Sequence, residues 1–263
     1  MRNFTFKGLF LTAVFILLGC LSIQAADDDL ITKQITIKLD EAGTLPDKIG
    51  SSRMYKITNL KIVGEIDGTD WDMIRMMAGR DYHGDVTKGN LSVLDLSEAK
   101  IVNGGGYYYY YDYDGWSYRY GTYYDKIGDY AFKGCSGLTS LTLPATITTI
   151  GKYAFRLCSG LTSIYAYAKK VPEIGSYAFE ECDAKKCTVY VPKGTYADYR
   201  SSEFGYFENI VEFDATGIDK TTTSTDVEEV SRYSVNGQRL VGPTKGLNIV
   251  KYSDGSVKKV AVE

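Results

Sequence analysis

The sequence predicts a β-rich α/β solenoid, a parallel strand ladder joined by short helical turns, followed by a small antiparallel β tail. Three segments carry nearly the same nine residues: Ile127–Cys135, Ile150–Cys158 and Ile174–Cys182. Their phenylalanines recur with a period of 23 and then 24 residues, at Phe132, Phe155 and Phe179. A fixed period in the twenties, together with the Leu-x-x-Leu-x-Leu spacing of Leu138–Leu143, is typical of a leucine-rich-repeat solenoid.

In each repeat the apolar residues follow two different spacings, one typical of a helical turn and one typical of a strand. One unit cannot bury its apolar side alone, but stacked units can bury it against their neighbours. A short helical turn is expected first, because four small or apolar residues share one helical face: Ile150, Ala154, Phe155 and Cys158. Leu138–Leu143 then alternates as a strand that points its leucines inward, and Pro144 ends it. Residues 145–150 are expected to form a second extended run.

The repeat also resembles a known family. The motif Ile-Gly-x-Tyr-Ala-Phe-x-x-Cys-Ser-Gly-Leu-Thr-Ser-Ile is similar to the BspA-type leucine-rich repeat of bacterial surface and secreted proteins. The resemblance is strong over residues 127–213 and weaker over 31–101. It implies a protein that is extracellular, acts by binding and is not an enzyme.

Residues 1–26 are expected to be a signal peptide. Arg2 and Lys7 form a basic start, and Leu9–Leu18 is an apolar stretch of about ten residues, too short for a bilayer span of roughly 20. In a second interpretation Leu17–Cys20 is a lipobox, and Cys20 is acylated. In the simpler one Cys20 is one more apolar residue of the signal peptide. No other apolar run of the sequence is long enough to span a membrane.

Residues 27–101 are expected to form an N-terminal cap and degenerate repeats. Strands are predicted over residues 31–39, 57–66 and 91–97. A helix is predicted over residues 70–78, with Thr69 or Asp70 as its N-cap and Gly79 ending it. Two apolar side chains are expected to be buried next to the turn that follows the first strand: Leu45 and Ile49.

An insertion interrupts the repeat at residues 102–125. Leu94 and its repeat equivalent Leu141 are 47 residues apart; one repeat accounts for 23, which leaves 24 surplus residues. Insertions in solenoids become loops on one side, often the binding side. We therefore expect an inserted loop between the N-terminal repeats and the regular ones.

The inserted loop is rich in aromatic residues, with ten of the chain's 23 tyrosines. Tyrosine gives a large contact area with few rotatable bonds, so recognition loops favour it. The candidate ligand-binding residues are Tyr107, Tyr108, Tyr109, Tyr110, Tyr111, Tyr113, Trp116, Tyr118 and Tyr120. They could stack on sugars or grip a protein. The competing interpretation is a low-complexity loop without a ligand.

Two patterns bear on metals, and neither predicts a site. Asp112-x-Asp114-Gly115 is half of a calcium loop, but Tyr123 stands where the twelfth-position Glu is needed. The sequence contains no Cys-x-x-Cys pair of the kind that binds zinc. We predict no metal and no cofactor.

The cysteines repeat with the period of the solenoid, at Cys135, Cys158 and Cys182. We expect them to line the core as small hydrophobic side chains. A bridge between Cys182 and Cys187 is possible in an exported protein, although two buried thiols are the favoured interpretation.

Residues 126–215 are expected to hold the leucine-rich repeats and a C-terminal cap. Thr188–Pro192 is predicted as the last strand, and a short helix follows it through Tyr199. Residues 204–213 then cover the open end, because a terminal repeat would otherwise expose its core.

The sequence pattern changes after the repeats, over residues 216–263. Residues 216–229 are predicted to be a linker and residues 230–263 a small β tail with two hairpins, at Asn236-Gly237 and Ser253–Gly255. The tail resembles the C-terminal sorting domains of proteins that the type-nine system of Bacteroidetes exports. The alternative is a small β appendage that ends the chain.

The sequence favours binding over catalysis. The net charge of −3 argues against a nucleic-acid partner, and His83 is the only histidine, in an expected loop. No nucleophile elbow, metalloprotease motif or phosphate loop is present. We predict an exported, adhesin-like module that binds a protein or glycan outside the cell. The alternatives are a structural spacer without a ligand and, more remotely, a carbohydrate-active enzyme. If the insertion is only a binding loop, deleting residues 102–125 should leave the fold intact.

Overall fold

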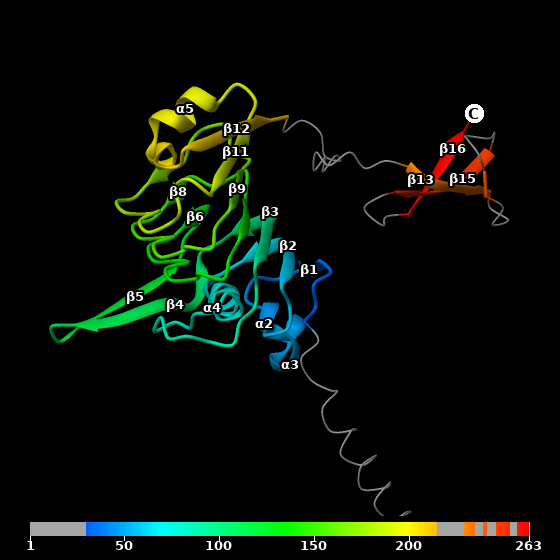
Figure 1. The fold of residues 1–263 in the computed structure, drawn as a ribbon. Helices are drawn as coiled ribbons and strands as arrows, with labels where there is room; N and C mark the ends of the chain where they lie inside the picture. Colours follow the sequence, from blue (N-terminus) through cyan, green and yellow to red (C-terminus); the bar gives the residue numbers. More distant parts are fainter. Residues whose placement is uncertain (1–29, 215–228, 235–238, 241–245, 253–256, 263) are drawn as a thin grey trace, which may run out of the picture. The chain divides into compact units, whose positions relative to one another are not determined.

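The computed structural model describes residues 30–214, 229–234, 239–240, 246–252 and 257–262 (Figure 1). The chain divides into two compact units, one ending at Ala215 and the other beginning at Thr216. The expected signal peptide, Cys20 and most of the expected linker lie outside the described residues. No helix among the described residues is both long and apolar enough to cross a membrane.

The first unit is built on one parallel sheet of seven strands. In spatial order its strands are β1 (Ile35–Leu39), β2 (Asn59–Ile66), β3 (Val93–Ile101), β7 (Ser140–Leu143), β9 (Ser163–Ala166), β11 (Thr188–Pro192) and β12 (Asn209–Phe213). Leu94 pairs with Leu141, as the repeat arithmetic predicts. Within β7, Leu141 and Leu143 are buried whereas Thr142 between them is partly exposed, so the inward leucines are confirmed.

A second, shorter ladder runs beside the sheet. It contains β10 (Glu173–Ile174), β8 (Thr149–Ile150) and β6 (Lys126–Ile127), all parallel, in that order. The second extended run predicted over residues 145–150 is therefore confirmed at its end. β6 is an edge strand of this ladder, which matters for the site described below.

The predicted helical turns between the two ladders are wrong. Residues 128–136 and their equivalents are turns, in which non-glycine residues such as Tyr130 (φ 60°) and Leu157 (φ 64°) are left-handed. The reason is the stacking of the repeats. Phe132 N donates to Ala154 O of the next repeat at 2.7 Å, and Phe155 N donates to Ala178 O at 2.8 Å. A helix would use these N–H groups within its own turn.

The face predicted from the apolar spacing is nevertheless buried, and the core consists of stacked equivalent residues. Phe132 and Phe155 stack at 5.4 Å, and Phe155 and Phe179 at 5.6 Å, between nearly parallel rings. The cysteine ladder is confirmed as buried, and all four cysteines of residues 30–214 are free thiols. Cys182 Sγ donates to Phe155 O at 3.2 Å, and burial raises the pKa of the Cys182 thiol to about 12.

Residues 30–101 contain three helices: α2 (Leu45–Ile49), α3 (Ser51–Met54) and α4 (Gly68–Met77). Leu45 and Ile49 are buried as predicted, but inside α2. The predicted N-cap of α4 is wrong, because Asp67 is the cap. Its carboxylate accepts from Thr69 N at 2.8 Å, and Asp67 N donates to the Asp70 carboxylate at 3.0 Å. Asp70 is thus the reciprocal member of a capping box.

The C-terminal end of the first unit is closed as predicted, by α5 (Tyr196–Ser201), the 3₁₀ helix η1 (Glu203–Tyr206) and β12. Phe204 and Phe207 are buried against Phe179, with ring centroids 5.2 and 5.0 Å away. Thr188–Pro192 is not the last strand of the sheet, because β12 pairs with it in parallel.

The second unit is a four-stranded antiparallel sheet, as the two predicted hairpins require. Its spatial order is β14 (Arg239–Leu240), β13 (Glu229–Ser234), β15 (Gly246–Tyr252) and β16 (Val257–Val262). The turn residues of both hairpins lie outside the described residues.

Candidate binding site

The tyrosine-rich insertion is a β-hairpin and not the loop that we expected. Its strands are β4 (Gly104–Tyr113) and β5 (Trp116–Thr122), and they project from the first unit (Figure 1). Asp114 and Gly115 form the two-residue turn, with φ values of 50° and 77°. Positive φ at both central residues is the hairpin turn that Asp-Gly favours. The half calcium pattern is therefore the hairpin turn.

The hairpin has two chemically different faces. Directly opposed residues lie on the same face, and three such pairs are aromatic: Tyr109 with Tyr120, Tyr111 with Tyr118, and Tyr113 with Trp116. These six residues are called the aromatic face. The opposite face is polar, because Asp112 accepts hydrogen bonds from Ser117 Oγ at 2.6 Å and from the Tyr110 hydroxyl. The Ser117 hydrogen bond, and then that of Tyr110, lowers the pKa of the Asp112 carboxyl.

The base of the hairpin belongs to the core of the first unit. Tyr108 is 1% exposed, lies 6.1 Å from Trp71 between ring centroids, and donates from its hydroxyl to Asp129 O at 3.0 Å. Tyr109 is 5% exposed. Both tyrosines are therefore buried, which the selection of ligand-binding candidates did not anticipate. The expectation that deleting residues 102–125 leaves the fold intact is also wrong, because the deletion would remove core side chains.

The glycine run before the tyrosines fixes where the hairpin starts. Gly105 has φ 67°, and a Cβ there would lie 2.5 Å from Asp67 Oδ1 and 2.6 Å from Thr69 N. Gly106 N donates to Thr69 Oγ1 at 3.2 Å. Only glycine lets the strand pass this close over the N-terminus of α4.

The aromatic face continues onto the repeats through three tyrosines that we call the tyrosine row: Tyr130, Tyr153 and Tyr177. Tyr109 stacks on Tyr130 at 5.0 Å, and the row follows with centroid distances of 5.3 and 5.4 Å. These residues were not predicted as part of a site. The signal was available, because tyrosine is the fourth residue of all three repeat segments. The aromatic face and the tyrosine row together form an aromatic corner.

Two pairs of rings in the corner are stacked. Tyr111 and Tyr118 stack at 5.0 Å with an interplanar angle of 15°, and Tyr153 and Tyr177 stack with an angle of 12°. Tyr130, in contrast, meets Tyr111 and Tyr120 edge to face, at 65° and 61°. The two stacked pairs therefore offer an approaching molecule mainly ring edges.

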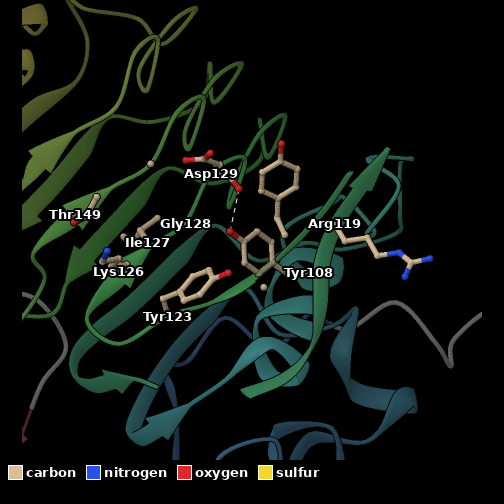
Figure 2. Close-up of a pocket in the computed structure, with 11 residues that line it drawn as sticks. Tyr108, Arg119, Tyr123, Lys126, Ile127, Gly128, Asp129 and Thr149 are labelled. Carbon is tan, nitrogen blue, oxygen red and sulfur yellow. Dashed lines mark hydrogen bonds between the residues drawn. The ribbon is translucent and has the colours of Figure 1, made fainter. Parts of the chain in front are cut away.

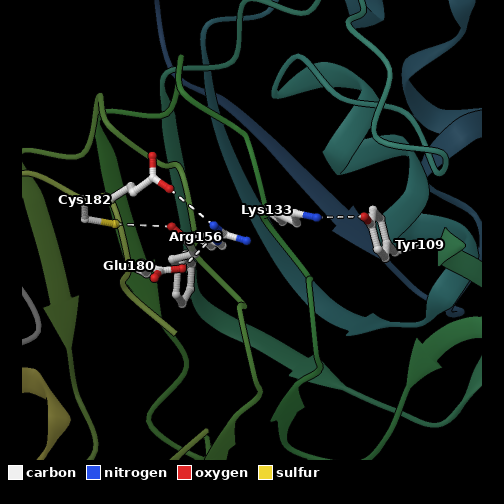
Figure 3. Close-up of polar contacts among 7 residues, drawn as sticks. Tyr109, Lys133, Arg156, Glu180 and Cys182 are labelled. Atoms are coloured by element: carbon white, nitrogen blue, oxygen red, sulfur yellow. Dashed lines mark hydrogen bonds and ion pairs between the residues drawn. The ribbon is translucent and has the colours of Figure 1, made fainter. Parts of the chain in front are cut away.

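Two cations border the tyrosine row, and Figure 3 shows the contacts of Lys133 with Tyr109 and of Arg156 with Glu180. Lys133 Nζ donates to the Tyr109 hydroxyl at 3.2 Å and lies 5.3 Å from the Tyr130 ring centroid. Arg156 lies 5.3 Å from the Tyr153 centroid and forms an ion pair of 2.6 Å with Glu180. These contacts hold the row in place, since cation–π attraction adds to the stacking.

Exposure rises toward the tip of the hairpin. Tyr118 is 41%, Tyr113 69% and Trp116 72% exposed. Tyr107, before the aromatic face, is also exposed, and Arg119 lies 5.7 Å from its centroid. Three predicted site residues are half-buried: Tyr110, Tyr111 and Tyr120. The structure thus brings most of the predicted residues together, with the accessible ones at the tip.

A cleft of about 380 Å³ lies beside β5 (Figure 2). One wall includes Arg119, Tyr120 and Gly121 of β5, and the other includes Lys126–Asp129 of β6 and the following turn. Tyr108 and Asp129, which are joined by the hydrogen bond from the Tyr108 hydroxyl to Asp129 O, also line it. Arg119 and Lys126 form no ion pair with any residue of the described chain.

His83 lies in a loop, as predicted, and is exposed. Its ring centroid is 4.1 Å from that of Tyr82 and 5.0 Å from that of Tyr110, and Tyr110 N donates to Tyr82 O at 2.8 Å. The histidine thus belongs to a contact between its loop and the hairpin. No group of three or more metal-ligating side chains that could hold a metal occurs in the described part of the chain.

Residues 125–235 match the family model described as BspA type Leucine rich repeat region, in six copies. No curated protein matches the chain. The matched segment begins with β6 and includes the three repeat segments seen in the sequence. The repeat region of this chain is therefore of the BspA-like leucine-rich-repeat type.

Proposed function

We propose that the protein is an exported binding module that engages an extracellular protein or glycan through the aromatic corner. One observation carries the proposal: the hairpin places six aromatic side chains on one face and exposes three of them at its tip. Tyrosine and tryptophan are the residues that dominate binding hot spots. Exposed aromatic side chains that gather in one place mark interaction surfaces in soluble proteins.

The anchored base supports this function. A two-stranded hairpin is marginally stable alone in water. Here Tyr108 and Tyr109 are held in the core, so the tip is presented on a fixed support. A pre-organised surface loses less entropy on binding than a mobile loop does. We therefore assign contact with the ligand to Tyr113, Trp116 and Tyr118, and support of the tip to Tyr111 and Tyr120.

The proposed location is outside the cell. It rests on the signal-peptide pattern of residues 1–26 and on the surface and secreted proteins that carry repeats of this type. Attachment could use acylated Cys20 or the β tail as a sorting domain, and the two routes predict different mature ends. Mass spectrometry of the exported protein separates them, because acylation leaves a lipid on Cys20 whereas sorting removes the tail.

A binding screen with matched variants tests the proposal. The chain without residues 1–26 is applied to arrays of extracellular-matrix proteins and glycans. The tip variant carries Tyr113→Ser, Trp116→Ser and Tyr118→Ser. The control variant carries Tyr165→Ser and Tyr190→Ser, which stack at 4.5 Å on the other side of the sheet strands, away from the core.

The outcomes separate three functions. Binding that is lost in the tip variant and kept in the control supports the aromatic corner. Binding that is kept in the tip variant and lost in the control instead places the site on the strand face of the solenoid. No specific binding by any form favours the spacer interpretation. Equal thermal unfolding of the three forms shows that loss of binding is not loss of fold.

A further inference from the structure

Among the described residues, β4 is the only strand paired with β5, so no described strand lies along the outer edge of β5. Tyr110 N points away from β5, because it donates to Tyr82 O at 2.8 Å. In an antiparallel pair, the residue opposite an outward-pointing residue also points outward. Arg119 opposes Tyr110 and Ser117 opposes Asp112, so the N–H and C=O groups of Ser117 and Arg119 face outward from β5.

The two outer edges of the hairpin are therefore not equivalent. The β4 edge is paired at Tyr110 with the loop that carries Tyr82. The backbone groups of Ser117 and Arg119 make no hydrogen bond outside the hairpin with any residue in the described ranges. An open edge of this kind is a template for another strand.

The cleft gives this edge a place for a partner (Figure 2). Its opposite wall begins with β6, which is itself an edge strand. The walls come together where Gly121 O lies 3.5 Å from the position of a Cβ on Gly128. From that closed end, β5 runs outward to the exposed tip. An added strand would enter from the tip and run along Ser117 and Arg119.

The charges of the cleft indicate the partner's side chains. Arg119 and Lys126 line it without a carboxylate partner among the described residues. The carboxylate in the same cleft, Asp129, already accepts from Lys152 N at 2.7 Å. The guanidinium of Arg119 points away from Lys126 (Figure 2), so acidic side chains at separate positions of the partner would give each cation a counter-charge.

The ring geometry favours a peptide over a sugar. Sugars stack on free aromatic faces, whereas the ring between Ser117 and Arg119, Tyr118, is stacked on Tyr111 along this part of β5. Ring edges and hydroxyls fit between the alternating side chains of a β-strand, in the same way as cross-strand neighbours.

We propose that β5 binds an extended, acidic polypeptide segment by strand addition, with the partner's alternate side chains on the aromatic face. The proposal rests on the proposed function and specifies its ligand class. In this mode main-chain hydrogen bonds give affinity, and side-chain contacts give specificity.

Two substitutions at one position test strand addition. Ser117→Pro removes an outward N–H and places a ring on the β5 edge, while the ladder bonds to β4 remain. Ser117→Ala is the matched control, since both variants lose the hydrogen bond from Ser117 Oγ to Asp112. The probe is a peptide selected on the wild-type chain from a phage-displayed random library.

We expect selected peptides to alternate apolar and acidic residues. They should bind the wild type and Ser117→Ala equally. They should bind Ser117→Pro at least about tenfold more weakly, because the proline removes a main-chain hydrogen bond and its ring blocks the β5 edge. Arg119→Glu should weaken the same peptides. In the wild-type complex, peptide addition should slow amide hydrogen exchange at Ser117 and Arg119, a readout that does not depend on any variant folding.

The remaining outcomes overturn the proposal in distinguishable ways. Peptides that bind Ser117→Pro as well as wild type, without protecting the Ser117 and Arg119 amides, rule out strand addition. Strand addition is also ruled out if glycans bind the wild type while no peptide is selected. If this glycan binding is lost in the tip variant, the proposed function as a binding module stands. If neither peptides nor glycans distinguish the wild type from the tip variant, both proposals fail.

Discussion

The guanidinium carbon of Arg75 lies 5.1 Å from the ring centroid of Tyr109. The same side chain donates from Nη1 to Tyr130 O and Ala131 O, both at 2.8 Å, and from Nη2 to Asp81 O at 3.1 Å. One fully buried cation thus joins helix α4, the base of the hairpin and the first repeat turn. It fixes the corner at which the aromatic face meets the tyrosine row.

Replacing Arg75 should therefore destabilise the first unit and loosen the hairpin. Arg75→Met keeps the aliphatic bulk but leaves carbonyl groups without donors, so we expect a loss of about 3 kcal/mol in the free energy of unfolding. Arg75→Lys should recover part of this, because an ammonium lacks the guanidinium fork. Urea unfolding measures both. A loss below ~1 kcal/mol for Arg75→Met would show that the cation is not the link described.

Position 128 must be glycine because the Tyr108 hydroxyl lies too close for a side chain there. A Cβ at Gly128 would lie 2.1 Å from that oxygen and 3.2 Å from the ring carbon that carries it. Gly128→Ala should therefore destabilise by about 1–3 kcal/mol through overpacking.

A double-mutant cycle isolates this contact. Tyr108→Phe removes the atom that clashes, although it also removes the hydrogen bond to Asp129 O. Gly128→Ala should cost clearly less in the Tyr108→Phe background than in the wild type. Equal costs in both backgrounds would contradict the close approach.

Leu157 occupies a left-handed position where the preceding repeat has glycine. Its φ is 64°, that of Gly134 is 77°, and Leu157 N donates to Glu180 O at 2.9 Å. The side chain is 38% exposed, so its removal costs some packing, which offsets part of the gain in the backbone. Leu157→Gly should raise the free energy of unfolding by about 0.5 kcal/mol, because glycine has no steric penalty there. Leu157→Ala should give no such gain, because alanine has the same steric penalty in the left-handed conformation. An equal gain in both variants would show that this penalty is not the cause.

Alkaline pH should unfold the protein through its buried phenols. Burial raises the pKa of Tyr108 and of Tyr199 above the ordinary value of 10.0. Above pH 10.0 the unfolded chain loses these protons while the folded chain keeps them. The stabilising contribution is therefore complete below pH 10.0 and is lost as the pH rises through the folded-state pKa values.

Thermal melts from neutral pH to above pH 10.0 measure this effect. Tyr199→Phe should make the pH dependence shallower, since it removes one such phenol together with its 2.7 Å hydrogen bond to Ala168 O. A melting temperature that does not change across this pH range would contradict the burial of these hydroxyls.

Periodicity predicted the parts of the fold that repeat. The spacing of Leu138–Leu143 predicted the strands, and the count from Leu94 to Leu141 predicted a pairing that the sheet contains. The turns could not be predicted in this way. Helical spacing places Ala154 and Phe155 inward, but every second N–H group of this segment, including that of Phe155, bonds to the next repeat, which a local pattern does not show.

Composition indicated the candidate site, but it did not predict the site's structure. Asp114-Gly115 between two aromatic runs is a hairpin signal that the loop interpretation overlooked. The burial of Tyr108 follows from contacts with Trp71 and Asp129, which are distant in sequence. The role of Tyr153 beside the hairpin depends likewise on how the repeats stack.

The most direct test of the central claim compares affinities for one ligand found in the binding screen. The claim is that the exposed aromatic residues Tyr113, Trp116 and Tyr118 form the binding surface. We predict that the tip variant binds that ligand at least about a hundredfold more weakly than the wild type, whereas the Tyr165→Ser/Tyr190→Ser control binds it within about twofold. Equal affinity of the tip variant and the wild type would contradict the claim.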